Sequence, residues 1–222
     1  NTLDKVSIDD SAVYKSLFIQ KSKSSGHFYR YTQASLAKNS DYQNFILTSG
    51  LKFNKSEIEV NLNEERTQCS ILSALNIKEN EHQEIKTRIN HYAPNCESYQ
   101  KIKNVVNENG KGVYQGKIFV KNIAQKTNAY QLSKALILNN SAEFDAKPEL
   151  EIYADDVKCS HGSTSGSIDK DAIHYLMTRG IDEKQAKQLL INGFLKDILE
   201  NVSNAQIREF LENTLEEQIH GY

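Results

Sequence analysis

Cys159 and His161 are the residues of this chain whose types and spacing could do chemistry together. They lie two positions apart in residues 155–162, a segment that joins the strand-like run 150–153 to the small-residue stretch 163–166, which we expect to be a turn. Side chains alternate along a strand, so the pair is expected to project from one face. A thiolate and an imidazole side by side suit a soft transition metal such as iron.

Two donors do not complete an iron–sulfur site, because such clusters usually have about four protein ligands. If the pair binds a cluster, the remaining ligands come from elsewhere, for example from a second subunit. The spacing alone favours a structural interpretation of the pair. Free cysteines are among the most buried residue types, and Cys-x-His without further ligands is a weak metal signal.

Charge, hydropathy and cysteine content argue against several classes of protein. The 222 residues carry 27 basic and 29 acidic side chains, for a net charge of −2, which is not the electrostatic footprint of a nucleic-acid-binding protein. We find no apolar run of membrane length. The three cysteines, Cys69, Cys96 and Cys159, do not make a disulfide framework, which predicts the cytoplasm or an equivalent reducing organelle compartment.

Catalytic motifs are missing from the sequence. There is no glycine-rich phosphate loop and no nucleophile elbow. His91 could be a ligand or base, or a packed histidine at a sheet edge, and we assign Cys69 and Cys96 to core or surface positions. The sequence therefore favours a scaffold over an enzyme.

Short strand-like runs fill the chain up to residue 167 and predict a mainly β architecture. Many short strands at near-regular spacing are typical of a sandwich, a barrel or a β-solenoid. Between these runs, Asn109-Gly110 is the single Asn-Gly dipeptide of the kind that closes tight hairpins, and this scarcity favours the solenoid. The runs are residues 28–34, 42–49, 56–62, 67–76, 85–92, 99–106, 112–120, 130–138 and 150–153.

After residue 167 the apolar period becomes helical. We expect a β-helix core over residues 1–167 and a small helical domain over residues 168–222, with Asp169 and Asp182 capping two helices. The second helix is expected to run to about Val202 and to anchor the tail through Leu190, Phe194 and Ile198. Its apolar stripe is wider than one core face needs, so either both stripes pack on the β domain or part of the tail docks a partner.

Several segments occur in an order that resembles the SufB/SufD family of iron–sulfur cluster assembly proteins, and most closely its SufD branch. The block over residues 148–162, Pro-Glu-Leu-Glu-Ile-Tyr-Ala-Asp-Asp-Val-Lys-Cys-Ser-His-Gly, is the most specific. The likeness covers roughly residues 42–202. Its other segments are residues 87–91, 98–101, 116–120, 124–131 and 171–181.

The resemblance implies a right-handed parallel β-helix followed by C-terminal helices, with the N-terminal part of the family chain missing. It also implies a non-catalytic scaffold that pairs with a SufB-like subunit through the β-helix, or with a second copy in its absence. A SufC-like ATPase would bind the helices, near residues 178–187. His161, with Cys159 beside it, would belong to a site at the subunit interface that holds a transient iron–sulfur cluster, His161 being the candidate iron ligand.

Two other functions stay open at this point. One is a β-helix that binds or cleaves polysaccharides, which would need outward carboxylates and basic residues on adjacent coils. The other is an assembly module without any role in metal chemistry.

Overall fold

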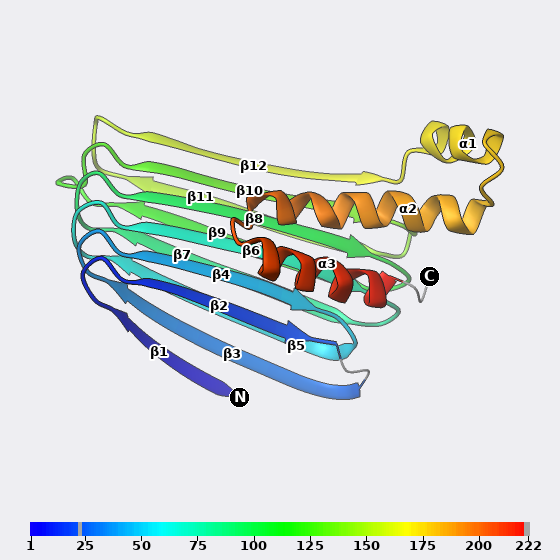
Figure 1. Cartoon of the computed structure of the whole chain (residues 1–222), viewed down its shortest axis with the longest axis horizontal. Coiled ribbons are helices and arrows are strands. Elements are labelled where there is room, and N and C mark those ends of the chain that lie inside the picture. Colours follow the sequence, from blue (N-terminus) through cyan, green and yellow to red (C-terminus); the bar gives the residue numbers. More distant parts are fainter. Residues whose placement is uncertain (22–23, 220–222) are drawn as a thin grey trace.

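The computed structural model describes residues 1–21 and 24–219, with side chains through Glu217. Within this part, the chain forms two parallel sheets of six strands each and alternates between them, which makes a β-solenoid (Figure 1). Each strand pairs with the strand two further along the chain rather than with its sequence neighbour. The predicted parallel β-helix is therefore confirmed. Hairpin dipeptides are scarce because consecutive strands do not pair with each other in the described residues.

The first sheet contains the odd-numbered strands β1 (Thr2–Ile8), β3 (Ser24–Leu36), β5 (Leu51–Leu62), β7 (His82–His91), β9 (Lys111–Val120) and β11 (Glu143–Ile152). The second sheet contains β2 (Val13–Gln20), β4 (Asp41–Thr48), β6 (Gln68–Ile77), β8 (Glu97–Val106), β10 (Asn128–Ile137) and β12 (Lys158–Ser167). The sequence did not predict β1 and β2, and the expected turn at residues 163–166 is wrong because these residues belong to β12.

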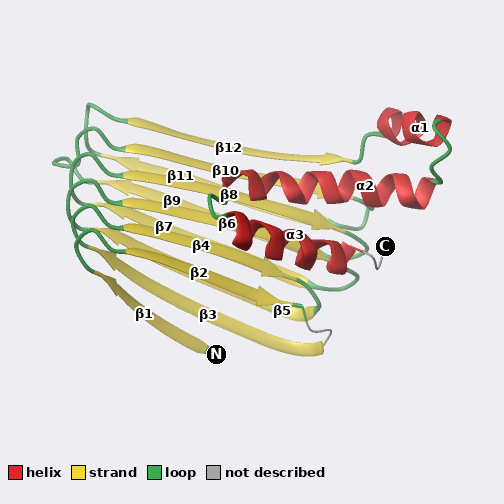
Figure 2. Cartoon of the chain, in the orientation of Figure 1, coloured by secondary structure: helices red, strands yellow, loops and turns green. Residues whose placement is uncertain are grey.

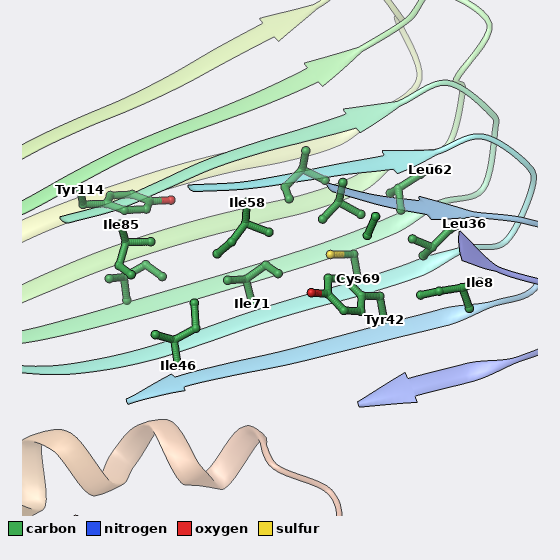
Figure 3. Packing of buried hydrophobic residues seen from close by; sticks show 14 of the residues in the cluster. Ile8, Leu36, Tyr42, Ile46, Ile58, Leu62, Cys69, Ile71, Ile85 and Tyr114 are labelled. Atoms are coloured by element: carbon green, nitrogen blue, oxygen red, sulfur yellow. The ribbon is translucent and has the colours of Figure 1, made fainter. Parts of the chain in front are cut away.

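In-register stacking builds the core between the sheets. Parallel pairing puts equivalent positions of successive coils into columns, so inward side chains of one coil lie directly on those of the next, as Tyr42 does on Cys69. Figure 3 shows Ile46, Ile58, Ile71 and Ile85 facing one another in this interior. Toward β11 and β12 the interior becomes more polar, with Gln100, Gln131 and Ser133 fully buried.

One of the two turn series repeats its backbone conformation from coil to coil. A residue with positive φ recurs every 27 to 31 positions and starts the approach to the next strand of the second sheet. The left-handed conformation is costly for residues with a Cβ, although Asn tolerates it best. The same turn geometry therefore aligns all coils. The residues are Ser11, Asn39, Arg66, Asn95 and Lys126.

Helices follow the last strand, and all but the first of them cover the outer face of the second sheet (Figure 2). They are α1 (Lys170–Thr178), α2 (Glu183–Lys196), the 3₁₀ helix η1 (Asp197–Asn201) and α3 (Ala205–Ile219). The predicted caps are confirmed, since Asp169 accepts from the backbone of α1 and Asp182 from that of α2. None of the helices in the described residues is long and apolar enough to span a membrane.

The helix that was expected to reach Val202 ends at Lys196 and continues as η1. Its anchoring stripe is confirmed in part. Ile198 is buried and half-buried Phe194 packs on the same interface, as predicted, whereas Leu190 is replaced there by Ile191 and Leu195, which are buried. The helix carries apolar residues in two adjacent rows, so spacing alone did not tell which row faces the sheet.

Candidate functional site at the end of the solenoid

The last coil of the solenoid leaves two strand edges open. Within the described residues, β12 pairs with β10 alone and β11 pairs with β9 alone. Their outer edges therefore present unpaired backbone N–H and C=O groups, which can template pairing with another strand. The rim of this end also exposes apolar side chains, with Ile152 37% and Tyr153 61% exposed.

Cys159 and His161 both lie on β12, in the inward-facing columns of this open end. Cys159 stacks on Ala129 and His161 on Gln131, and both of these β10 residues are buried. The expectation that the two side chains share one face is therefore confirmed. Two strand positions separate their Cα atoms by about 7 Å. Because no further coil covers them, His161 is exposed and Cys159 is half-buried.

The Cys159 thiol is not activated by its own surroundings. Burial raises its pKa, and a hydrogen bond from the Ala129 backbone opposes this only in part. It packs beside a small apolar cluster that includes Val120 and Ala154. Since the thiolate is the metal-binding form, an incoming metal ion would have to displace this proton, and a base or solvent would have to accept it.

A buried hydrogen-bond network lies below His161. The Tyr114 hydroxyl lies 3.3 Å from Gln131 Oε1 and 3.4 Å from Gln100 Oε1. One hydroxyl hydrogen serves only one acceptor, so one of the two amides must turn its nitrogen toward the phenol. Gln100 Nε2 has no other partner among the described atoms, which favours Gln100. Burial is the main cause that raises the pKa of Tyr114, to about 12, so the phenol stays protonated.

Gly116 makes room for this network. A Cβ at this position would lie 2.2 Å from the Tyr114 hydroxyl oxygen and 2.6 Å from Gln131 Oε1. Gln131 also contacts the last strand of the first sheet, where its Nε2 lies 3.5 Å from the main-chain oxygen of Glu149. The network therefore connects the interior with the coil that carries Cys159 and His161.

The other cysteines and His91 lie away from this end. Cys69 is buried in the core, and burial raises the pKa of its thiol. Cys96 is buried in a turn, where its thiol donates to the main-chain oxygen of Glu64 at 3.2 Å. His91 is fully buried in β7, a central strand rather than an edge, with Nε2 2.9 Å from Ser98 Oγ. Burial lowers its pKa to about 3, so it is neutral.

Across the described residues, no group of three or more His, Cys, Asp and Glu side chains is placed to hold a metal ion. Cys159 and His161 thus bring two candidate donors to the open end, and the residues that the structure describes add no third.

Two features of the structure were missed by sequence reasoning, one at this end and one under the helices. The network of Tyr114, Gln100 and Gln131 could be inferred only from strand register, although Gln and Ser at alternating positions of buried strands were a signal. The second is an ion-pair cluster in which Lys101 and Lys103, on the outer face of β8, both bind Asp197. Nothing in the local sequence connects these distant segments.

The fold and the composition of this end define a parallel β-solenoid with a Cys-x-His pair on its terminal edge strand. The family described as "SUF system FeS cluster assembly, SufBD core domain" matches residues 1–194. The chain belongs to this family. The match begins earlier than the resemblance seen in the sequence, and it includes all twelve strands of the described structure together with α1 and most of α2.

Similarity to individual proteins agrees with the family. The chain is 38% identical over 148 residues to the iron–sulfur cluster assembly protein SufD of Escherichia coli, which is 67% of this chain and 35% of that protein. It is 31% identical over 192 residues to a SufBD family protein of Synechocystis, covering 86% of this chain and 42% of the relative. SufD of Bacillus subtilis is 31% identical over 133 residues, which is 60% of this chain and 30% of that protein.

The chain thus spans less than half the length of these relatives. The family assignment favours cluster assembly over the polysaccharide-cleaving alternative.

Proposed function

We propose that this chain is the SufD-like scaffold part of a SUF assembly complex, which builds an iron–sulfur cluster as cargo at the open end of the solenoid. The observation that carries the proposal is the family match over residues 1–194, which includes the edge strand with Cys159 and His161. On this proposal the chain is a non-catalytic scaffold, working in the cytoplasm or an equivalent reducing compartment.

The open end suits a SufB-like partner. The free edges of β11 and β12 can extend their sheets into a second solenoid by strand addition. Exposed Ile152 and Tyr153 at the rim add apolar surface that such a partner would cover. Without a SufB-like subunit, a second copy of this chain presents the same edges.

A cluster site whose ligands come from two subunits would explain why this chain offers only two candidate donors among its described residues. His161 and, more weakly, Cys159 would bind the nascent cluster, and the partner would supply the rest. An imidazole ligand binds metal only when it is unprotonated, so its bond is sensitive to protons. A site of this kind opens when the subunits shift, which suits a cluster that has to be passed on.

The helices suit an ATPase partner of the SufC type. Thr178 and the residues up to Lys187 form the end of α1, a turn and the first turn of α2, and most of them are exposed. Tyr175 and Met177 on α1 expose apolar surface next to this segment. ATP hydrolysis would take place in that partner and reach the solenoid through the helices.

The test is cluster loading of the complete protein with its SufB-like partner, after anaerobic reconstitution with iron and sulfide. His161→Ala should abolish cluster loading and leave thermal unfolding and partner binding unchanged. His174→Ala is the matched control, because His174 is also an exposed histidine but lies on α1. Cys159→Ser should reduce loading less than His161→Ala. Full loading by His161→Ala would contradict the ligand role, and loss of folding together with loading would make the residue structural.

A further inference from the structure

The strand that carries Cys159 and His161 has an unusual composition for a strand. Among its ten residues, β12 contains two glycines, four serines and a threonine, but no large apolar side chain. None of the ten is buried. Glycine and serine contribute little packing on a pleated surface, so side-chain burial contributes little to holding this strand in place.

The contacts of β12 with its neighbour are correspondingly few. Backbone pairing with β10 runs over the full length of the strand. Two hydrogen bonds that involve side chains join the strands: Ser133 Oγ lies 2.9 Å from Ser163 Oγ, and the Ala129 backbone binds the Cys159 thiol. The helices that cover the inner strands of the second sheet pack on β4, β6 and β8 (Figure 2).

The other terminal strand is held more firmly, although its edge is equally open. Phe144 and Leu150 of β11 are half-buried and pack on the two interior clusters. Ion pairs also tie this strand to β9, with Lys111 Nζ 2.9 Å from Asp145 Oδ2 and Lys117 Nζ 2.5 Å from Glu151 Oε2. An open edge alone therefore does not make a terminal strand easy to detach. Strand β12 differs from β11 because its side chains provide fewer packing contacts and no ion pairs to its neighbour among the described residues.

A short connection joins β12 to α1. After Ser167 come Ile168, which is half-buried against the apolar interface under the helices, and Asp169, which caps α1. Helix α1 packs on α2 and buries only Ile173 of its described side chains. Figure 1 shows α1 beyond the ends of the strands, in direct continuation of β12. A displacement of α1 would reach β12 through the two residues between them, Ile168 and Asp169.

We propose that β12 is a detachable edge strand, which can separate from β10 as a unit while the rest of the solenoid stays folded. Movement of helix α1 would pull β12 away from β10. Ile168 would first have to leave the apolar interface under the helices. Resting on the proposed function, the inference adds its regulation: separation of β12 withdraws His161 and Cys159 from the interior columns and opens the cluster site for release. Local opening of weakly packed segments is a general property of folded proteins.

The first test needs no cluster. Hydrogen exchange of the complete protein, without partners, should show β12 amides exchanging at least about tenfold faster than those of β10 and β11, a difference of about 1.4 kcal/mol in opening free energy. Ile168→Ala should increase β12 exchange further and leave β10 unchanged. Equal exchange in β11 and β12 would mean that the whole last coil frays, and the proposal would be wrong.

The second test locks the strand. Ser133→Cys with Ser163→Cys puts two thiols at register neighbours, at a Cα separation that a disulfide tolerates. Oxidation with diamide should then slow cluster transfer from the complex to an apo-ferredoxin acceptor by at least about tenfold, and reduction should restore it. As matched control, Ser98→Cys lies beside native Cys69 and locks β6 to β8; its oxidation should leave transfer unchanged.

Transfer by the oxidised β12 lock at the rate of its reduced form would overturn the proposal. If the unmodified complex builds no cluster at all, the proposed function fails instead, and the exchange experiment still decides whether β12 opens.

Discussion

Lys103 on β8 donates a hydrogen bond of 2.6 Å from Nζ to the main-chain oxygen of Phe194, where α2 ends. The same ammonium group lies 4.5 Å from the centre of the Phe194 ring and forms an ion pair with Asp197. Burial lowers the pKa of Lys103, while the Asp197 carboxylate opposes this change. A buried lysine on the sheet therefore fixes the point at which α2 becomes η1.

Asp197→Asn should destabilise the protein by about 2 kcal/mol, because it leaves buried Lys103 and Lys101 without their carboxylate. The loss falls below the usual range for buried pairs, since the Asp197 side chain is 42% exposed and Lys103 keeps its bond to Phe194. Lys187→Gln, which breaks an exposed pair with Glu183, should cost no more than about 0.5 kcal/mol. Equal unfolding free energies of the two variants in urea would contradict the cluster's role.

His91 should make stability fall in mild acid. Its pKa is about 3 in the folded protein, below the ordinary value near 6.5, because the ring is buried. The unfolded chain takes up the proton first, so stability is complete above about pH 6.5 and is lost as the pH falls toward 3, by up to ~1.4 kcal/mol per unit. Urea unfolding at a series of pH values measures this slope.

His91→Gln should remove that part of the pH dependence, although it will also lower stability at neutral pH through the lost packing and the altered contact with Ser98. His174→Gln, at an exposed position, should keep the slope of the unmodified protein. A His91→Gln slope as steep as that of the unmodified protein would assign the acid sensitivity to other groups.

Gly116→Ala should cost about 2 kcal/mol, because its Cβ would overlap with the Tyr114 hydroxyl and the Gln131 amide. Gly166→Ala is the control, since a Cβ at that position meets nothing within 4 Å, and it should change stability by less than about 0.5 kcal/mol. Tyr114→Phe in the Gly116→Ala background should recover part of the loss by removing the nearest atom. A double-mutant cycle of thermal unfolding checks this coupling, and simple additivity would contradict it.

Tyr175→Ala should weaken binding of a SufC-like ATPase by about tenfold, if exposed aromatic surface on α1 anchors that partner. Phe210→Ala provides the comparison, because Phe210 is similarly exposed but lies on α3. Titration calorimetry with the isolated ATPase gives both dissociation constants. Equal effects of the two substitutions would place the contact elsewhere on the helices.

Strands whose side chains alternate or are β-branched could be predicted from the sequence, because half-buried pleated surfaces select those residues. The caps at Asp169 and Asp182 could be predicted as well, since their hydrogen bonds are local. The shared face of Cys159 and His161 followed from strand alternation, whereas their role as ligands stays a prediction.

What the sequence did not predict depends on partners far along the chain. Residues 163–166 have turn-like composition and become part of a strand because β10 offers a complete row of hydrogen-bonding groups. The helix expected to reach Val202 changes to η1 at Asp197, where Lys101 and Lys103, about a hundred residues away, bind the Asp197 carboxylate. No local pattern contains such contacts.

Left-handed turn residues recur once per coil, from Ser11 to Lys126, so the coils that carry them share the same turn geometry. The length of the solenoid can therefore change by whole coils. Removing one residue from an inner strand would point the rest of that strand's side chains to the opposite face, and their columns would lose these partners. Removing or inserting one complete coil would join a turn to its equivalent and keep every column intact. The solenoid can thus be lengthened or shortened by whole coils without loss of the stacking between the remaining ones.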